Sequence, residues 1–529
     1  MTNHLTPEQI ALGRQNANTA LGVTRRDFLK AAAIAAPGAA YFGYKTLGDD
    51  KPVRAAIIGT GNEGCQAMIR YHNREYLDYI RVCDARPSQL ERARKEFLDH
   101  KQYTADDQKT MKWSADIDDV INDKDVELVV IALPLWLHAP ISIKAMQAGK
   151  HVFCEKLMAH NVSDCKTMCK VARKENRLLA IGHQRHYSAL YDNANELVKA
   201  GQLGEIRHIR ALWHRNNGQP QIAKDKDGKL RYDDMGNPVH VKDEAGNVMY
   251  FDSWKPDIPL ADRGIDFDKY GYKSLDEMIR WRLYNRTGAG LMAELGSHQL
   301  DACSIFLGKK HPLAVTGMGG NYYYSDGREV DDHVFVNFEF PGKPKDEGGR
   351  DNDRVIVTYS SITTNAFEKY GEELLGTQGT MIVEEERDIL LFKESDRNKP
   401  LAGGGPLKTS LTVENKGGKP VLETSASTAG PTAASSLGGL ATADPSKGSR
   451  EELEHFAYCI RKGVKSDYHG DDEHQPRCRG EVALADAVIA LTSNLAMRQK
   501  RRIEFDERWF DWQSPEVPEG STGGIARRE

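Results

Sequence analysis

The chain has 529 residues, which is too many for one ordinary hydrophobic core and favours at least two packed domains. Charged residues make up 28% of the chain, hydrophobic residues make up 40%, and the formal net charge is -5. This balance is typical of soluble globular proteins and gives no basic patch that would indicate nucleic acid as a partner.

The cysteines and histidines do not form patterns that would indicate a metal site. The eight cysteines are scattered without CxxC spacing, and Cys165 and Cys169 are small core residues of an expected helix. No HxxxH or HxH pattern lies on one expected element. We therefore expect mostly buried thiols and no metal.

The N-terminal region carries two arginines, Arg25 and Arg26, ahead of a mild apolar run at residues 31–44. This order resembles a twin-arginine export signal, and the run is shorter than the ~20 residues of a membrane-spanning helix. We assign residues 1–50 to the signal and its linker, with cleavage after Ala40 as one option. We expect an exported, periplasmic protein that uses the twin-arginine translocation machinery, or a membrane-tethered one if the signal stays uncleaved. The alternative is an amphipathic helix with a chance Arg-Arg pair.

Short apolar runs alternate with helical stretches over the next part of the chain. Strands are expected at residues 53–58, 80–83, 128–133, 151–154 and 178–181, and helices at residues 87–97, 138–148 and 163–175. This alternation is typical of βαβ units with a parallel sheet. We therefore assign residues 51–182 to a Rossmann dinucleotide-binding domain.

Longer segments with alternating polar and apolar residues follow, and they suit an antiparallel sheet with one covered face. Strands are expected at residues 206–213, 333–340, 354–361, 380–383 and 501–505, and a helix at residues 481–498. We assign residues 183–510 to a domain for substrate binding and oligomerisation, with loop insertions at 218–259 and 401–449, and residues 511–529 to a tail. The expected fold is thus α/β: an N-terminal Rossmann parallel sheet, then an α+β domain with a large, mostly antiparallel open sheet.

A glycine-rich turn joins the first expected strand to the next helical segment, with the sequence Gly59-Thr60-Gly61-Asn62-Glu63-Gly64. Such a turn brings backbone amides and a helix N-terminus to a pyrophosphate. Asp84 ends the second strand, where a carboxylate accepts hydrogen bonds from the hydroxyl groups of the adenosine ribose. Asp84 favours NAD as the cofactor, while Arg86 leaves NADP open.

These and later motifs resemble the glucose-fructose oxidoreductase, inositol dehydrogenase and rhizopine-catabolism (Gfo/Idh/MocA) family. The later motifs are Ala132-Leu133-Pro134, Trp136-Leu137-His138-Ala139-Pro140, Ala148-Gly149-Lys150-His151-Val152, Glu155-Lys156, Gly182-His183-Gln184-Arg185, Gly201-Gln202-Leu203-Gly204, Gly296-Ser297-His298-Gln299-Leu300-Asp301 and Gly376-Thr377-Gln378-Gly379-Thr380. The resemblance spans nearly all of residues 53–505. The Glu-Lys-Pro motif of the family stands here as Glu155-Lys156-Leu157.

The resemblance implies roles for particular residues. Lys156 would lie beside the nicotinamide, His298 would act as the base, and Glu294 would hold and polarise His298. Besides the turn, Asp84, Arg86 and Lys156, the implied cofactor site comprises Leu133, Pro134, Trp136, His138, Glu155, Gln184 and Arg185. Substrate contacts are expected from Tyr187, Arg282 and Asp301.

The expected activity is NAD(P)-dependent oxidation or reduction at a CH-OH group of a sugar, cyclitol or related polyol, in a homodimer or homotetramer. Two alternatives remain open: a redox-neutral, glycosidase-like enzyme that uses NAD, and a cofactor-binding module without catalysis. Because an exported enzyme meets little free dinucleotide, we expect a tightly bound cofactor. The stretch from the signal to Pro52 is a candidate cover for it.

Overall fold

A computed structural model describes residues 1–21, 42–99, 103–242, 246, 248–394, 447–463 and 474–520, and the backbone of residues 411–416 and 419–424. The expected export signal at residues 24–30 and most of the 401–449 insertion lie outside the described residues. Residues 411–416 and 419–424 form a two-stranded hairpin, β14 (Leu411–Lys416) and β15 (Lys419–Thr424).

The Rossmann sheet has six parallel strands in the order β3-β2-β1-β4-β5-β6. The strands are β1 (Val53–Ile58), β2 (Leu77–Cys83), β3 (Lys112–Ser114), β4 (Leu128–Ile131), β5 (His151–Glu155) and β6 (Leu179–Gly182). Every residue of β4, β5 and β6 is buried, because helices cover both faces of the sheet. The parallel sheet expected from the alternation of apolar runs is confirmed.

Helices on the two faces of this sheet bury separate clusters of side chains. Along β1, Ala56 and Ile58 pack in one cluster, and Val53 and Ile57 pack in the other. The helical elements are η1 (Gly64–Ile69), α4 (Pro87–Asp99), α5 (Ala105–Thr110), α6 (Ile117–Ile121), η2 (Leu135–Leu137), α7 (His138–Gln147) and α8 (Val162–Lys174).

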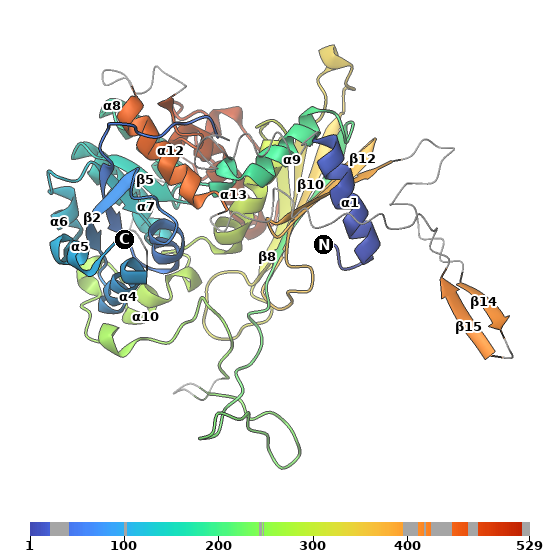
Figure 1. Ribbon diagram of the computed structural model, residues 1–529, viewed down its shortest axis with the longest axis horizontal. Coiled ribbons are helices and arrows are strands. Elements are labelled where there is room, and N and C mark those ends of the chain that lie inside the picture. Colours follow the sequence, from blue (N-terminus) through green and yellow to red (C-terminus); the bar gives the residue numbers. More distant parts are fainter. Residues whose placement is uncertain are drawn as a thin grey trace.

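A helix from near the C-terminus completes the Rossmann layer. In α12 (Ser449–Lys462), Leu453 and Phe456 are buried in the same cluster as Val53 and Ile57. Arg461 of this helix is paired with Glu127 at 2.7 Å. Figure 1 shows α12 lying across the Rossmann unit. The first domain therefore includes a segment that the sequence assigns to the second domain.

The second sheet has eight strands in the order β13-β12-β11-β7-β10-β9-β8-β16. Its strands are β7 (Ile206–His214), β8 (Ala314–Gly320), β9 (His333–Pro341), β10 (Arg354–Ile362), β11 (Tyr370–Gly376), β12 (Gly379–Glu384), β13 (Asp388–Lys393) and β16 (Ile503–Glu504). Only the pairing of β10 with β7 is parallel among the described strands of this sheet. The expected large, mostly antiparallel sheet is confirmed.

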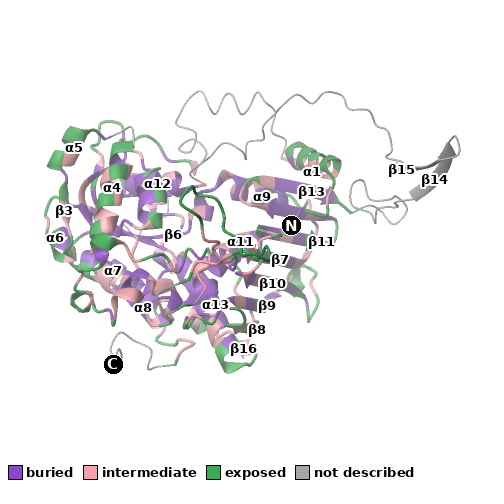
Figure 2. Ribbon diagram, turned by 90° about the horizontal axis from the view of Figure 1, so that it is seen from below, coloured by how far each residue is buried: buried purple, intermediate pink, exposed green. Residues whose placement is uncertain are grey.

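Helices cover the inner face of the second sheet, next to the Rossmann unit (Figure 2). They include α9 (Ala189–Lys199), α11 (Ser297–Phe306) and α13 (Gly480–Gln499). Among the described residues, α13 alone is long and apolar enough to cross a membrane, but 78% of its apolar window is buried in the protein. We therefore identify α13 as a core helix.

The outer face of the same sheet is partly covered by the N-terminal helix α1 (Pro7–Ala20). Gly13 of α1 lies against β13, where an added Cβ atom would come within 2.8 Å of the Phe392 ring. Asn16 donates a hydrogen bond of 3.0 Å to the carbonyl oxygen of Leu391. Part of the region assigned from the sequence to a signal and linker is therefore packed on the second domain.

Two other expectations can be compared with the described residues. All eight cysteines are buried and free, as expected. The 218–259 insertion leaves the core as an arm (Figure 1) that is held by isolated bridges, such as Pro220 to Tyr250.

Candidate active site

A cavity of about 680 Å³ lies between the glycine-rich turn and the second domain. Most predicted site residues line it: Gly59, Gly61, Asn62, Glu63, Asp84, Arg86, Leu133, Pro134, His138, Glu155, Lys156, Gln184, Arg282, Glu294 and His298. The fold therefore brings both ends of the predicted site, more than 200 residues apart in sequence, around one space.

The turn has the geometry that a dinucleotide requires. Gly59 has a φ of +91°, and an added Cβ atom would lie 2.2 Å from the carbonyl oxygen of Ala132. A Cβ atom on Gly64 would lie 2.1 Å from the carbonyl oxygen of Gly59. Gly61 faces open space, so its backbone is free for close approach by a ligand.

Asp84 lies at the end of β2 and lines the same cavity. One carboxylate oxygen accepts a 2.7 Å hydrogen bond from the Thr60 amide, and the other accepts a 2.8 Å bond from the Arg86 amide. Burial raises the pKa of Asp84, although these amides act in the opposite direction. Each carboxylate oxygen has a further lone pair, so Asp84 can also accept hydrogen bonds from ribose hydroxyls. The residues present therefore fit NAD.

Lys156 joins the two domains at the other end of the cavity. Its Nζ donates a 2.8 Å hydrogen bond to the backbone carbonyl of Glu294. The Lys156–Leu157 peptide bond is cis. Lys156 comes directly after β5, where clefts open in parallel α/β sheets.

The prediction that Glu294 holds His298 is wrong in this structure. The Glu294 carboxylate pairs with the Arg282 guanidinium at 2.6 Å. Glu294 lies in a π-helical turn, η7 (Met292–Gly296), ahead of α11, so the spacing of four residues does not place it against His298. Burial would raise the pKa of Glu294, but the charges of Arg282 and Lys156 outweigh burial and lower it.

His298 lies at the start of α11, with its ring centroid 5.4 Å from that of Trp213 on β7. Burial lowers the pKa of His298 well below its ordinary value, and the positive charges of Lys156 and Arg185 lower it further. The imidazole is therefore neutral at neutral pH, which is the state in which it can accept a proton.

Two buried carboxyl groups, Glu155 and Glu452, also line the cavity. Burial raises the pKa of Glu155 to about 8, and the negative charge of Glu63 adds to the effect. Burial also raises the pKa of Glu452 well above its ordinary value, as does the charge of Glu155. The Glu155 carboxylate leaves no room beside Gly182, where a Cβ atom would lie 2.9 Å from a Glu155 oxygen.

Several predicted site residues lie outside the cavity lining. Thr60, Gly64, Trp136, Arg185, Tyr187 and Asp301 are the members of this group. Thr60 is buried and supports the turn through Asp84, while Trp136 packs edge-on against Tyr272. Arg185 is buried between Glu372 and Glu386 and donates to the His298 carbonyl at 2.6 Å.

The structure does not bring Tyr187 and Asp301, the expected substrate contacts, to the cavity lining. The Tyr187 hydroxyl lies 2.9 Å from His455 Nδ1, and Asp301 pairs with His186 at 2.8 Å and Lys309 at 3.0 Å. Both side chains are buried. His138 lines the cavity, but both its ring nitrogens lie 2.8 Å from backbone carbonyl oxygens, those of Leu157 and Leu133.

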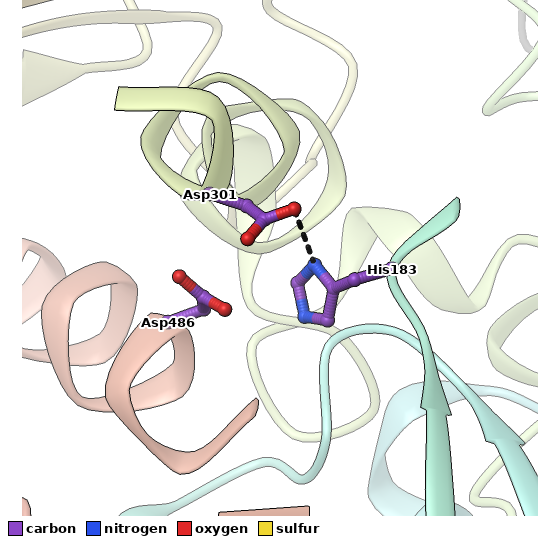
Figure 3. Close-up of side chains that lie close together, drawn as sticks. All are labelled: His183, Asp301 and Asp486. Carbon is purple, nitrogen blue, oxygen red and sulfur yellow. Dashed lines mark ion pairs between the residues drawn. The ribbon is translucent and has the colours of Figure 1, made fainter. Parts of the chain in front are cut away.

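A cluster of His183, Asp301 and Asp486 lies buried between β6, α11 and α13 (Figure 3). Their ligand-type atoms lie within 4.8 Å of one another, as in a site for a cation. Lys309 already compensates the charge of Asp301, and burial raises the pKa of Asp486 well above its ordinary value.

The sequence interpretation missed the second-domain residues that close the cavity. These are Trp213, Arg215, Ser253, Trp254, Tyr270, Tyr272, Met278, Tyr370, Glu386 and Lys447. Five of them come from residues 253–278, a segment that covers part of the cavity. The expected cover runs from the signal to Pro52. Its described residues 42–52 do not line the cavity and pack on α12, as in the 2.6 Å hydrogen bond that the Tyr44 hydroxyl donates to Glu454. The aromatic residues Trp254, Tyr270 and Tyr272 within residues 253–278 were an available sequence signal.

The comparisons with known proteins agree with this architecture. Residues 53–183 match the family model described as oxidoreductase family, NAD-binding Rossmann fold. Residues 265–382 match the GFO/IDH/MocA C-terminal domain. In solved structures, the aldose-aldose oxidoreductase of Caulobacter crescentus has a TM-score of 0.52 at 19% identity, covering 86% of this chain and 100% of that chain. A levoglucosan dehydrogenase in complex with NADH and L-sorbose has a TM-score of 0.53 at 14% identity, with the same coverages. These structures share the fold.

Sequence relatives match shorter stretches. Inositol 2-dehydrogenase of Salmonella paratyphi B is 30% identical over 172 residues, or 32% of this chain and 48% of the relative. A glycosyl hydrolase family 109 protein of Shewanella baltica is 26% identical over 233 residues, or 40% of this chain and 50% of the relative. The chain thus spans about half the length of the curated relatives it matches. Residues 53–183 and 265–382 thus match the models of the two domains of the Gfo/Idh/MocA oxidoreductase family.

Proposed function

We propose that the protein is an NAD-dependent oxidoreductase that acts on a CH-OH group of a sugar, cyclitol or related polyol. The observation that carries the proposal is the meeting of Lys156 and His298 in one cavity with the glycine-rich turn and Asp84. A lone glycine-rich turn would support only nucleotide binding. A cation and a neutral imidazole at the opposite end of the same space add the groups that a hydroxyl oxidation needs.

Bound NAD supplies the hydride acceptor, held by the turn and Asp84. Lys156 is fixed by the Glu294 carbonyl, so its ammonium group is available to orient a substrate oxygen and to stabilise negative charge on it. His298, neutral because of burial and nearby cations, accepts the hydroxyl proton. Arg282 also lines the cavity and is available for substrate oxygens while Glu294 holds it.

The test is to titrate the purified protein with NAD and then offer inositols and aldoses while recording the absorbance of reduced nicotinamide. We expect NAD binding and reduction with at least one polyol. Absence of dinucleotide binding would contradict the proposal. Denaturing the purified protein and identifying any released dinucleotide by mass spectrometry tests our further proposal that the cofactor is tightly bound.

A second candidate is a redox-neutral reaction in which the enzyme oxidises a sugar carbon, breaks a glycosidic bond and returns the hydride. The family 109 glycosyl hydrolase relative from Shewanella baltica favours this candidate. The two functions differ in their cofactor balance. Product release from a glycoside without net accumulation of reduced nicotinamide would identify the second function.

Export and self-association are also proposals. Export rests on the twin-arginine sequence at residues 24–30, and comparing protein levels in periplasmic and cytoplasmic fractions tests it. Association of two or four copies is supported by exposed apolar side chains on the second sheet, namely Met318, Phe335 and Ile356. Light scattering of the purified protein measures the number of copies.

A further inference from the structure

The side chain of Arg86 is held by a carboxylate from the second domain. Arg86 lies two residues after Asp84 and lines the adenosine end of the cavity. Its Nε donates a 2.9 Å hydrogen bond to Asp262, while its backbone amide donates to Asp84. The side chain of Arg86 is therefore held by a carboxylate of the second domain, and its backbone by a carboxylate of the first.

Burial and hydrogen bonds hold the Asp262 carboxylate in this position. It is fully buried, with 0% exposure, at the end of a short helical turn, η4 (Leu260–Asp262), that contacts α4. It also accepts hydrogen bonds from the backbone amide of Ser88 at 3.0 Å and the Ser88 hydroxyl at 2.6 Å. A buried carboxylate with three donors, one of them a guanidinium, has a fixed geometry.

NADP differs from NAD by a 2'-phosphate on the adenosine ribose. An arginine near the end of the second strand is what commonly accommodates the 2'-phosphate of NADP. In this chain, the set of Asp84, Arg86 and Asp262 carries two negative charges and one positive charge. Arg70, another cation in the cavity lining, is paired with Glu96 at 2.7 Å. The adenosine end therefore disfavours an added phosphate.

We propose that Asp262 determines cofactor specificity: by pairing with Arg86 it withholds this guanidinium from a 2'-phosphate and makes the cavity select NAD over NADP. The inference rests on the proposed function, because it concerns which dinucleotide the same site takes. Asp84 contributes through direct repulsion, and Asp262 acts through Arg86 from the other domain.

The experiment measures NAD and NADP affinities separately by calorimetry for the wild type and Asp262→Asn. The asparagine can keep the Ser88 contacts but removes the charge that holds Arg86. We expect NADP affinity to rise about tenfold, equivalent to about 1.4 kcal/mol, while NAD affinity stays within about threefold. The matched control is Asp266→Asn, an exposed acid in the same segment, which should leave the ratio of affinities unchanged.

A second variant keeps the test decisive if Asp262→Asn does not fold. As a single change, Arg86→Ala should not lower NADP affinity relative to NAD affinity, because the Arg86 side chain is already paired with Asp262. In the Arg86→Ala background, Asp262→Asn should no longer raise NADP affinity.

A preferential loss of NADP affinity in Arg86→Ala would overturn the inference. So would an unchanged ratio in folded Asp262→Asn, or an equal change in Asp266→Asn. If the wild type bound neither dinucleotide, the proposed function itself would fail, whereas tight NAD binding with an unchanged ratio would reject only the role of Asp262.

Discussion

Lys156 Nζ donates a 2.8 Å hydrogen bond to the backbone carbonyl of Glu294, and this contact links the Rossmann domain to the second domain at the reacting end of the cavity. The lysine follows a buried strand, and its acceptor lies in the turn before the helix that carries His298. The position of the cation relative to the base is therefore set by the backbone of both domains.

Replacing Lys156 by alanine should reduce turnover by about 10²- to 10⁴-fold, the usual contribution of a positioned group that acts on the reacting oxygen. NAD affinity should stay within about threefold, because the turn and Asp84 hold the dinucleotide. The measurement is steady-state kinetics together with NAD titration. Lys144→Ala is the control, since Lys144 is half-exposed on α7 and pairs with Asp118 at the surface. Equal activities in both variants would remove Lys156 from the mechanism.

Replacing His298 by alanine should reduce turnover by a similar factor, about 10²- to 10⁴-fold. Because the pKa of His298 lies well below its ordinary value, the neutral base persists as the pH falls through 6.5, the ordinary histidine value. The acid limb of the wild-type turnover profile should therefore lie below pH 6.5. His208→Ala, on β7 with its ring 2.9 Å from the Ile356 carbonyl oxygen, should leave turnover unchanged. Near-normal turnover in His298→Ala would refute the assignment.

Glu294 and Arg282 should act as one unit, because their side chains form a 2.6 Å ion pair within the cavity lining. Glu294→Gln and Arg282→Gln should each lower kcat/KM by about 10- to 100-fold, and the double variant should be no worse than the worse single variant. Full additivity of the two effects would show that Glu294 acts on another group. A double-mutant cycle provides the measurement.

Glu155 should make stability fall as the pH rises. Its pKa in the folded state is about 8, above its ordinary value of 4.5, so the folded protein keeps a proton that the unfolded chain releases. The contribution is present below pH 4.5 and is lost as the pH rises towards 8. Glu155→Gln should therefore flatten the dependence of the free energy of unfolding on pH, by at most about 1.4 kcal/mol per pH unit.

The measurement for Glu155 is chemical denaturation at several pH values between 4.5 and 8, without added dinucleotide. The control is Glu196→Gln, because Glu196 is 61% exposed and pairs with Lys199 on the same helix. Parallel stability curves for the wild type and Glu155→Gln would contradict the assigned pKa.

The parallel sheet and the glycine-rich turn could be predicted because their signals are local. Each buried strand is a short apolar run, and Gly59 to Gly64 directly follow the first run. The same holds for β9 and β10, whose side chains alternate between a buried and an exposed face. For Lys156 and His298, the resemblance to a known family implied a shared site, and both residues line one cavity.

The parts that sequence could not predict depend on contacts between distant segments. Helix α12 packs on the Rossmann layer, and α1 packs on β13. The hydrophobic periodicity of a helix does not indicate which distant segment it packs against. The partner of Glu294 depends on a π-helical turn, which residue spacing cannot distinguish from an α-helix. Asp262 pairs with a residue 176 positions away, so its role emerges only from the packing of η4 on α4.

The most direct test of the central claim follows a hydride from substrate to NAD. A polyol that reduces nicotinamide in the substrate screen is labelled with deuterium at its reacting carbon and mixed with the wild type and NAD. The mass of the dinucleotide recovered after denaturation is then measured. The account predicts reduced dinucleotide carrying one deuterium in the wild type, and about 10²-fold or more slower labelling in His298→Ala with unchanged NAD affinity. Conversion of the polyol with no deuterium in the dinucleotide at any time would contradict it.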